Sequence, residues 1–408
     1  MKEVINMAVI GLGQRGFGLM RGVLLNQKDV KLVAVCDSYQ DRVDDAIKEI
    51  KTRTDVDAVG FTDYEKVFEV ENLDAVLVAT AWEYHNEITM YALRKGIPVA
   101  MEVGGAYCES ELWDLVKTYE ETKTPLMFME NCCYDKTEVL ATAMARAGLF
   151  GTIVHMEGSY SHDLRSEIAG GNINRHYRLR NYTSRNCENY PTHEIGPIAK
   201  VLDINRGNRF VSLVSVASKA EGLKEFVKSD PEKYAELQNV EFKQGDIVDT
   251  IITCANGETV RIKLDTTLPR FYARNFTLQG TKGFYEQNTN TVFIEGKHKE
   301  EFWTALDSYK AMIDNAKEYE DEYMPNFWKT LTKEQQEAGH GGMDYFEFRA
   351  FIDAVKNGTE MPIDVYDAAT WMAITELSEK SIAMGGATLP FPDFTCGKWL
   401  VRPRKDVF

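Results

Sequence analysis

The residues best suited to acid–base chemistry lie in residues 189–197, NYPTHEIGP. His193 follows Tyr190, Pro191 and Thr192 and opens a pattern of apolar residues typical of a helix. Imidazole titrates near neutral pH, and the first turn of a helix disfavours its positively charged form. His193 is therefore a candidate general base, with the Tyr190 hydroxyl close to it in sequence.

Two other interpretations of this stretch stay open. Thr192 could be a plain N-cap and His193 a polar residue of the first turn, since threonine is common at helix starts. A metal site made by His193 with Glu194, His176 or Cys187 has less support, because no HExxH motif or paired CxxC spacing is present. We expect no metal ion.

A second motif, GLGQRG, places Gly11, Gly13 and Gly16 in GxGxxG spacing between a strand pattern and a helix pattern. Asp37 follows the next strand. A glycine turn needed only for packing is the weaker interpretation, because four features agree. They predict NAD binding, with the pyrophosphate at the helix N-terminus and a ribose hydroxyl on Asp37, which would repel the 2′-phosphate of NADP.

The elements that must position these motifs divide the chain in two. Residues 1–130 alternate short apolar strands with helices, which is typical of an α/β domain with a doubly wound parallel sheet of Rossmann type. Residues 131–408 contain longer strands with alternating faces, and the hairpin signals ANGE and GTKG. They predict an α+β domain with an open, mostly antiparallel sheet, and helices at roughly 305–338, 343–356 and 366–384.

Ligands bind at the carboxyl ends of the strands in doubly wound sheets. On position alone, His85 is as readily structural as functional. The candidates at these ends are Thr80, Trp82, His85, Glu102, Val103 and Asn131.

Composition excludes some classes of function. With 47 Lys and Arg against 63 Asp and Glu, the formal net charge is −16, which argues against binding to a nucleic-acid backbone. No apolar run approaches a membrane span, and no leader pattern opens the chain. Seven scattered cysteines without a CxxC pair are typical of a reducing compartment. We expect a cytoplasmic protein, or an exported or periplasmic one if a leader was trimmed.

Several motifs together resemble glycoside hydrolase family 109, within the Gfo/Idh/MocA oxidoreductase superfamily. They are WEYH, MEV, MEN, YSHDLR, NYPTHEIGPIAKVLDINRGNRF, PRFYARNFTLQGTKG and GHGGMDY. At residues 102–104 the superfamily's Glu-Lys-Pro is replaced by EVG, so the lysine that assists hydride transfer is missing and an ordinary sugar dehydrogenase is less expected. The chain also departs from the family at Glu194, where a small residue is expected, and around residues 166–188.

The resemblance implies an NAD-dependent glycosidase, a recognised exception to the use of two carboxylates. The best-known members are α-N-acetylgalactosaminidases. The implied chemistry is oxidation at the sugar 3-hydroxyl, loss of the C2 proton with departure of the glycosidic oxygen, addition of water, and return of the hydride, with the cofactor recycled.

The resemblance also assigns residues. Those expected to contact NAD are Arg15, Gly16, Asp37, Trp82, His85, Glu102, Val103 and Asn131. Those expected to line the sugar site are Tyr160, Arg178, Tyr190, Pro191, Thr192, His193 and Tyr272, with His193 and Tyr190 catalytic. His340 in GHGGMDY is equally a structural turn residue or a site residue.

Two other functions stay open: a conventional NAD-dependent sugar dehydrogenase with His193 as base, and a non-catalytic protein that binds NAD and sugar. We expect a small-molecule or glycan-terminal sugar as substrate, and neither nucleic acid nor membrane as partner. By analogy with the superfamily, we also expect a homo-oligomer.

Overall fold

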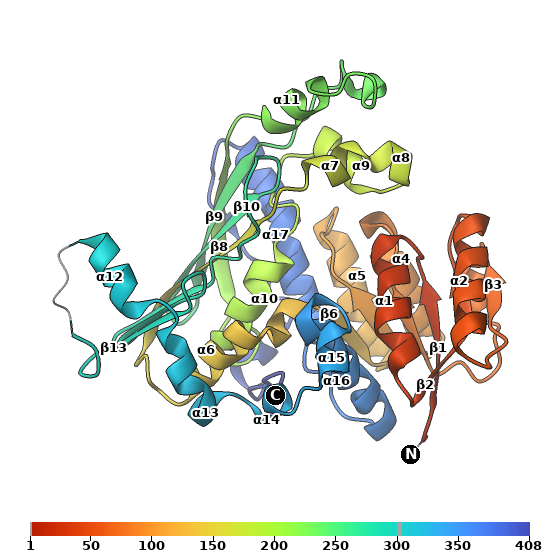
Figure 1. Ribbon diagram of the computed structural model, residues 1–408, viewed down its shortest axis with the longest axis horizontal. Helices are drawn as coiled ribbons and strands as arrows, with labels where there is room; N and C mark the ends of the chain where they lie inside the picture. Colours follow the sequence, from red (N-terminus) through yellow and green to blue (C-terminus); the bar gives the residue numbers. More distant parts are fainter. Residues whose placement is uncertain (1, 300–303) are drawn as a thin grey trace. The chain divides into compact units, whose positions relative to one another are not determined.

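The computed structural model describes residues 2–299 and 304–408, which form two compact units (Figure 1). Unit 1 consists of the chain up to Tyr134 together with Leu331–Ala369, and unit 2 of Asp135–Thr330 together with Thr370–Asp406. The segment Leu331–Ala369, which we expected in the C-terminal domain, thus belongs to unit 1. It is tied there by a hydrogen bond from the Phe128 N–H to the Ile363 carbonyl.

Unit 1 contains a six-stranded parallel sheet in the order β3-β2-β1-β4-β5-β6. Its strands are β1 (Ile5–Ile10), β2 (Val30–Cys36), β3 (Val59–Phe61), β4 (Ala75–Val78), β5 (Val99–Glu102) and β6 (Leu126–Met129). Its helices include α1 (Gln14–Gly22), α2 (Gln40–Arg53), α3 (Tyr64–Val67), α4 (Trp82–Arg94), α5 (Glu109–Thr122), α15 (Lys333–Glu337) and α16 (Met343–Asn357). The strand order reverses between β1 and β4, where such sheets bind ligands.

Unit 2 contains an eight-stranded sheet in the order β13-β12-β11-β7-β10-β9-β8-β14. The strands are β7 (Ile153–Ser161), β8 (Phe210–Ala217), β9 (Ile247–Cys254), β10 (Thr259–Asp265), β11 (Thr277–Gly280), β12 (Gly283–Glu286), β13 (Thr291–Ile294) and β14 (Leu389–Pro390). Every pairing is antiparallel except that of β7 with β10. Both hairpin predictions are confirmed, as is the predicted fold class.

The helices of unit 2 are mostly short. They include α6 (Lys136–Arg146), α7 (Arg165–Ala169), α8 (Gly171–Asn174), α9 (Arg178–Ser184), α10 (Thr192–Val201) and α11 (Gly222–Lys228). The long helix α17 (Val365–Ala383) and helix α16 match the sequence predictions.

The helical character expected at 305–338 is present, but it is divided among several short helices. The chain forms four short helices there, α12 (Ala305–Met312), α13 (Glu320–Tyr323), α14 (Asn326–Lys329) and α15. Asp314 has a left-handed φ of 65° after α12, and Pro325 holds the residue before it in an extended conformation after α13. In the part of the chain that the structure describes, no helix has the length and apolar character needed to cross a bilayer.

Candidate active site

The glycine turn between β1 and α1 leaves no room for side chains. Gly11 has a φ of 98°, and a Cβ there would lie 2.4 Å from the Ala79 carbonyl oxygen. A Cβ on Gly16 would lie 1.9 Å from the Gly11 carbonyl oxygen. The first N–H groups of α1, which begins after Gly13, have no acceptors within the helix. The turn therefore fits the close approach of a pyrophosphate.

Asp37 is tied to this turn. Its Oδ2 accepts a hydrogen bond from the Leu12 N–H at 2.7 Å, and its Oδ1 accepts one from the Tyr39 N–H at 3.0 Å. Arg42 Nη1 lies 3.4 Å from Oδ2. The carboxylate is 8% exposed, and its remaining lone pairs suit the ribose hydroxyl expected from the sequence.

His85 in α4 is a buried, uncharged ring. Its Nε2 lies 3.0 Å from the Thr80 carbonyl, and burial lowers the pKa of the ring to about 4, although the backbones of Thr80 and Glu102 partly oppose this shift. Since a carbonyl can only accept, Nε2 carries the proton of the neutral ring. The ring thus lies fixed at the carboxyl end of the sheet, where such folds bind their cofactor.

Steric packing explains why a glycine, Gly104, ends the EVG stretch. A Cβ on Gly104 would lie 2.9 Å from Trp82 Cδ1 and 3.2 Å from His85 Nδ1. Glycine thus leaves room for the Trp82 and His85 rings, both of which are buried. Val103 is buried as well, at 4% exposed.

Two predicted cofactor residues, Arg15 and Asn131, bind the carboxylate of Asp344, and a third, Glu102, binds Arg15. Arg15 donates through Nη1 and Nη2 to Asp344 at 2.9 and 3.0 Å, and through Nε to Glu102 at 2.8 Å. Asn131 Nδ2 donates to Asp344 Oδ1 at 2.8 Å. His340 Nδ1 lies 2.8 Å from Asp344 Oδ2. Sequence analysis did not single out Asp344, although the GHGGMDY motif contains it.

The charged groups of this network shift one another's pKa values. Burial acts to lower the pKa of Arg15, but Glu102 and Asp344 outweigh it and raise that pKa well above its usual value. Burial acts to raise the pKa of Asp344, but Arg15 and His340 hold it below its usual range. Burial, aided by Glu102 and Asp344, raises the pKa of the fully buried Glu347 carboxyl well above its usual value.

In unit 2, three predicted sugar-site rings come together. Tyr160 and Tyr190 have ring centroids 4.6 Å apart, and His193 packs edge-on against them at 5.3 and 4.8 Å. Tyr160 comes from β7, whereas Tyr190 and His193 come from the approach to α10 and from its first turn. The cluster therefore forms where α10 packs on β7.

The close packing of α10 on β7 also accommodates Glu194. A Cβ on Gly158 of β7 would lie 2.8 Å from Glu194 Cβ, so glycine makes room for the larger side chain.

The interpretation of Thr192 as the N-cap of α10 is wrong. Thr192 is the first helical residue, Pro191 holds the cap position, and the buried Thr192 Oγ1 makes no hydrogen bond within the described chain.

Arg178 and Tyr272 complete the predicted sugar site. Arg178 Nε lies 2.8 Å from Glu167 Oε1, and its guanidinium carbon lies 4.9 Å from the Tyr190 ring centroid. The Tyr272 ring lies 6.4 Å from that of Tyr160 and remains 47% exposed. The structure thus gathers cationic, phenolic and imidazole groups in one cluster, a set able to bind hydroxyl groups and to move protons.

Sequence analysis missed His162. Its Nδ1 lies 3.4 Å from the Tyr160 hydroxyl, and its ring lies 5.1 Å from that of Tyr272. Residues two apart on an extended strand share a face, so Tyr160 and the YSHDLR motif could have signalled this neighbour.

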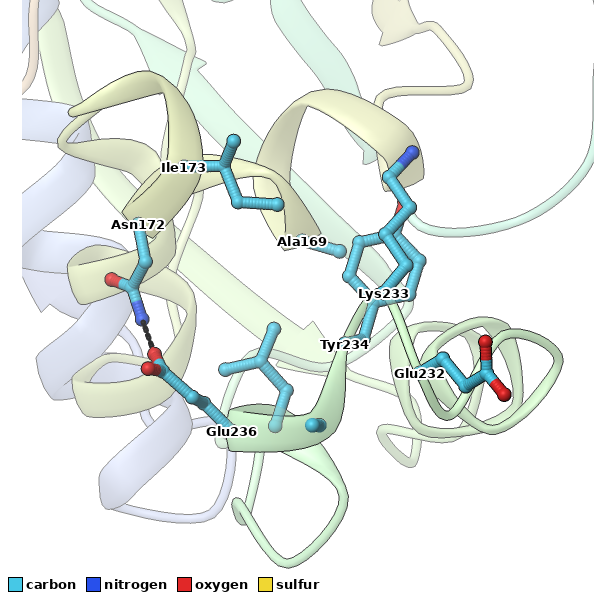
Figure 2. Close-up of a pocket in the computed structure, with 9 residues that line it drawn as sticks. Ala169, Asn172, Ile173, Glu232, Lys233, Tyr234 and Glu236 are labelled. Atoms are coloured by element: carbon cyan, nitrogen blue, oxygen red, sulfur yellow. Dashed lines mark hydrogen bonds between the residues drawn. The ribbon is translucent and has the colours of Figure 1, made fainter.

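A separate pocket of about 430 Å³ lies between α8 and η3 (Ala235–Leu237) (Figure 2). Asn172 Nδ2 donates to Glu236 Oε2 at 3.2 Å on its wall, and the Lys233 ammonium lies 5.1 Å from the Tyr234 ring centroid. The lining consists of Ala169, Asn172, Ile173, Glu232, Lys233, Tyr234, Ala235, Glu236 and Leu237. The residues predicted to bind cofactor or sugar are not among them.

Comparison with known families bears on both units. Residues 5–127 match an oxidoreductase family with an NAD-binding Rossmann fold, and residues 134–401 match the C-terminal domain of glycosyl hydrolase 109. The chain belongs to glycoside hydrolase family 109. This family 109 member is a glycoside hydrolase with an NAD-binding Rossmann domain, as the sequence predicted.

Similar proteins agree with this assignment. A family 109 protein of Stenotrophomonas maltophilia is 39% identical over 99% of this chain and 91% of its own. An alpha-N-acetylgalactosaminidase of Tannerella forsythia is 38% identical over 98% of this chain and 88% of its own. A levoglucosan dehydrogenase solved with NADH and levoglucosan superposes with a TM-score of 0.70 at 17% identity, covering 95% of this chain and 99% of its own. At that identity the likeness shows the fold alone.

Proposed function

We propose that this family 109 hydrolase cleaves N-acetylhexosamine glycosides, foremost α-N-acetylgalactosaminides, by transient oxidation at the sugar 3-hydroxyl. The observation that carries the proposal is the cluster of Tyr160, Tyr190 and His193 in a chain with an NAD-binding fold. The Tannerella forsythia relative's name supports the choice of sugar.

Bound NAD supplies the redox chemistry, accepting a hydride from the sugar and returning it. Oxidation at C3 acidifies the C2 proton, and His193 removes that proton as the glycosidic oxygen departs. A general base must reach the proton it takes, and His193 lies in ring contact with both Tyr160 and Tyr190. Tyr190 donates a hydrogen bond that orients or protonates a sugar oxygen.

Arg178 supplies a fixed positive charge. Burial acts to lower its pKa, but nearby Tyr177, Tyr160 and Glu167 outweigh burial and keep that pKa well above its usual value. A guanidinium that stays charged binds sugar hydroxyls or the acetamido carbonyl. Because the guanidinium lies over the Tyr190 ring, the two side chains would hold the sugar in one orientation.

The test is a panel of α- and β-linked nitrophenyl glycosides, assayed with and without added NAD while absorbance reports any NADH. We expect release of nitrophenol from the α-N-acetylgalactosaminide without net accumulation of NADH. Accumulation of NADH from a free sugar without release of nitrophenol would identify a dehydrogenase instead. Neither signal with any sugar would reject both enzymatic assignments.

A further inference from the structure

The Tyr160 hydroxyl has an imidazole partner that the proposed function does not use. Tyr160 is 5% exposed and is the second-last residue of β7, where it pairs in register with Leu264. His162 is the first residue after β7, and its backbone N–H donates to the Asp265 carbonyl at 2.9 Å. Its Nδ1 lies 3.4 Å from the Tyr160 hydroxyl, a long hydrogen bond of the kind that tightens when substrate binds.

We propose that Tyr160 and His162 form a proton relay for the oxidation step. This inference rests on the proposed function. When the hydride leaves C3, the proton of the sugar 3-hydroxyl passes to Tyr160 Oη, and the phenolic proton of Tyr160 passes to His162 Nδ1. The C3–H and O–H bonds break, the C3=O bond forms, and NAD is the oxidant. Reduction at the end of the cycle returns the proton by the same path.

The surroundings favour a neutral His162 that can accept a proton. Burial lowers its pKa, Arg178 and His193 lower it further, and Glu167 and Asp163 partly oppose them. The charged or titratable groups around the ring are Tyr160, Asp163, Glu167, Arg178, His193 and Tyr272.

A relay is needed because a phenol alone is a poor base. An unperturbed tyrosine loses its proton near pH 10, so it can take the sugar proton near neutral pH only while passing its own proton onward. Val103, where the superfamily carries a lysine, has no group that could take up a proton. Geometry assigns His162 this task, while His193 is left for the C2 proton.

The first arm of the test reads the pair directly by NMR of the NAD-loaded enzyme with ¹⁵N-labelled histidine rings. We expect His162 Nδ1 to be an unprotonated acceptor above neutral pH, and its shift to change in Tyr160→Phe. The His162→Asn variant identifies the signal. A ring that carries its proton on Nδ1 would overturn the relay, because it could only donate to Tyr160.

The second arm measures NADH formation in a single turnover, using the glycoside that the panel identifies. We expect His162→Asn to slow this step by about 10²- to 10⁴-fold and to flatten its pH profile, while sugar affinity measured by calorimetry stays unchanged. The control is His155→Asn in β7, whose ring contacts Thr259 and Glu157.

The outcomes separate the two proposals. If NADH forms in a single turnover of His162→Asn with the same rate and pH profile as in the wild type, the relay alone is overturned. No transient in the wild-type enzyme, with nitrophenol still released, would reject oxidation at C3 and the relay with it. Loss of sugar affinity in His162→Asn with an unchanged transient would reduce His162 to a structural role.

Discussion

The two candidate sites are formed by different kinds of side chain, charged in unit 1 and aromatic in unit 2. In unit 1, Arg15, Glu102 and Asp344 form a buried network of ion pairs at 2.8 to 3.0 Å. In unit 2, the rings of Tyr160, Tyr190 and His193 pack against one another. Fixed charges suit the holding of a cofactor that must not dissociate, whereas phenol and imidazole groups can both give and take protons.

The comparison implies that substitutions in the two sites fail in different ways. Removing a ring from the unit 2 cluster should stop turnover and leave cofactor binding and folding intact. Removing a charge from the unit 1 network should cost stability or cofactor binding first. The predictions below test this separation, starting from the largest expected effect.

Replacing His193 with alanine should abolish most of the activity. Loss of a general base typically costs about 10²- to 10⁴-fold in rate. NAD content, measured after gel filtration, should stay at the wild-type level. His155→Ala, which removes a histidine from outside the cluster, should keep full activity. A near-wild-type rate for His193→Ala would remove this residue from the mechanism.

Replacing Asp344 with alanine should destabilise the protein, because it leaves Arg15, whose side chain is 34% exposed, with only Glu102. Removing one partner of a fully buried pair costs about 3–5 kcal/mol, and since solvent screens Arg15 we expect a smaller loss, about 1–3 kcal/mol. Urea denaturation checks this. Asp353→Ala on the same helix α16 is the matched control: its pair with Arg349 is exposed and should contribute at most about 1 kcal/mol. Equal losses of unfolding free energy in Asp344→Ala and Asp353→Ala would show that the Arg15 network contributes no more to stability than an exposed ion pair.

The strands of both sheets could be predicted from the sequence because the patterns that indicate them lie in neighbouring residues. Continuous apolar runs predict β4 to β6, and the ANGE and GTKG turns predict the hairpins from neighbouring residues alone. The helical pattern of residues 305–338 did not show where its helices end, because such a pattern does not reveal a left-handed residue such as Asp314.

Only part of each candidate site could be predicted from the sequence. Tyr160, Tyr190 and His193 could be named from motifs, and the structure brings them together. Asp344 could not be assigned to Arg15, because 329 positions separate them and only the tertiary fold makes them neighbours. The lowered pKa of His85 was equally hidden, since it depends on burial rather than on residue type.

His85 gives the unit 1 site a pH dependence of stability. Its pKa is roughly 6.5 unfolded and about 4 folded, so between these values the unfolded chain binds more protons. Stability should therefore fall as pH drops from about 6.5 to 4, by about 3 kcal/mol in total from this group. His85→Gln, which keeps an N–H donor for Thr80, should flatten this part of the curve. Urea denaturation from pH 4.5 to 7.5, at constant NAD, measures both slopes. Parallel curves would mean that His85 is not buried in neutral form.

The smallest effect expected concerns cofactor choice. Asp37→Ala removes the carboxylate that accepts the Leu12 and Tyr39 N–H groups, and with it the proposed ribose contact. A hydrogen bond to a charged group is worth about 1.5–3 kcal/mol, so NAD affinity should fall about 10- to 100-fold. NADP binding should improve at the same time, since no carboxylate would repel its 2′-phosphate. Calorimetry with each cofactor tests this, with Asp44→Ala on the exposed face of α2 as control. Weaker binding of both cofactors would show that Asp37 only holds the glycine turn, and unit 1 would then select its cofactor through Arg15 and its partners.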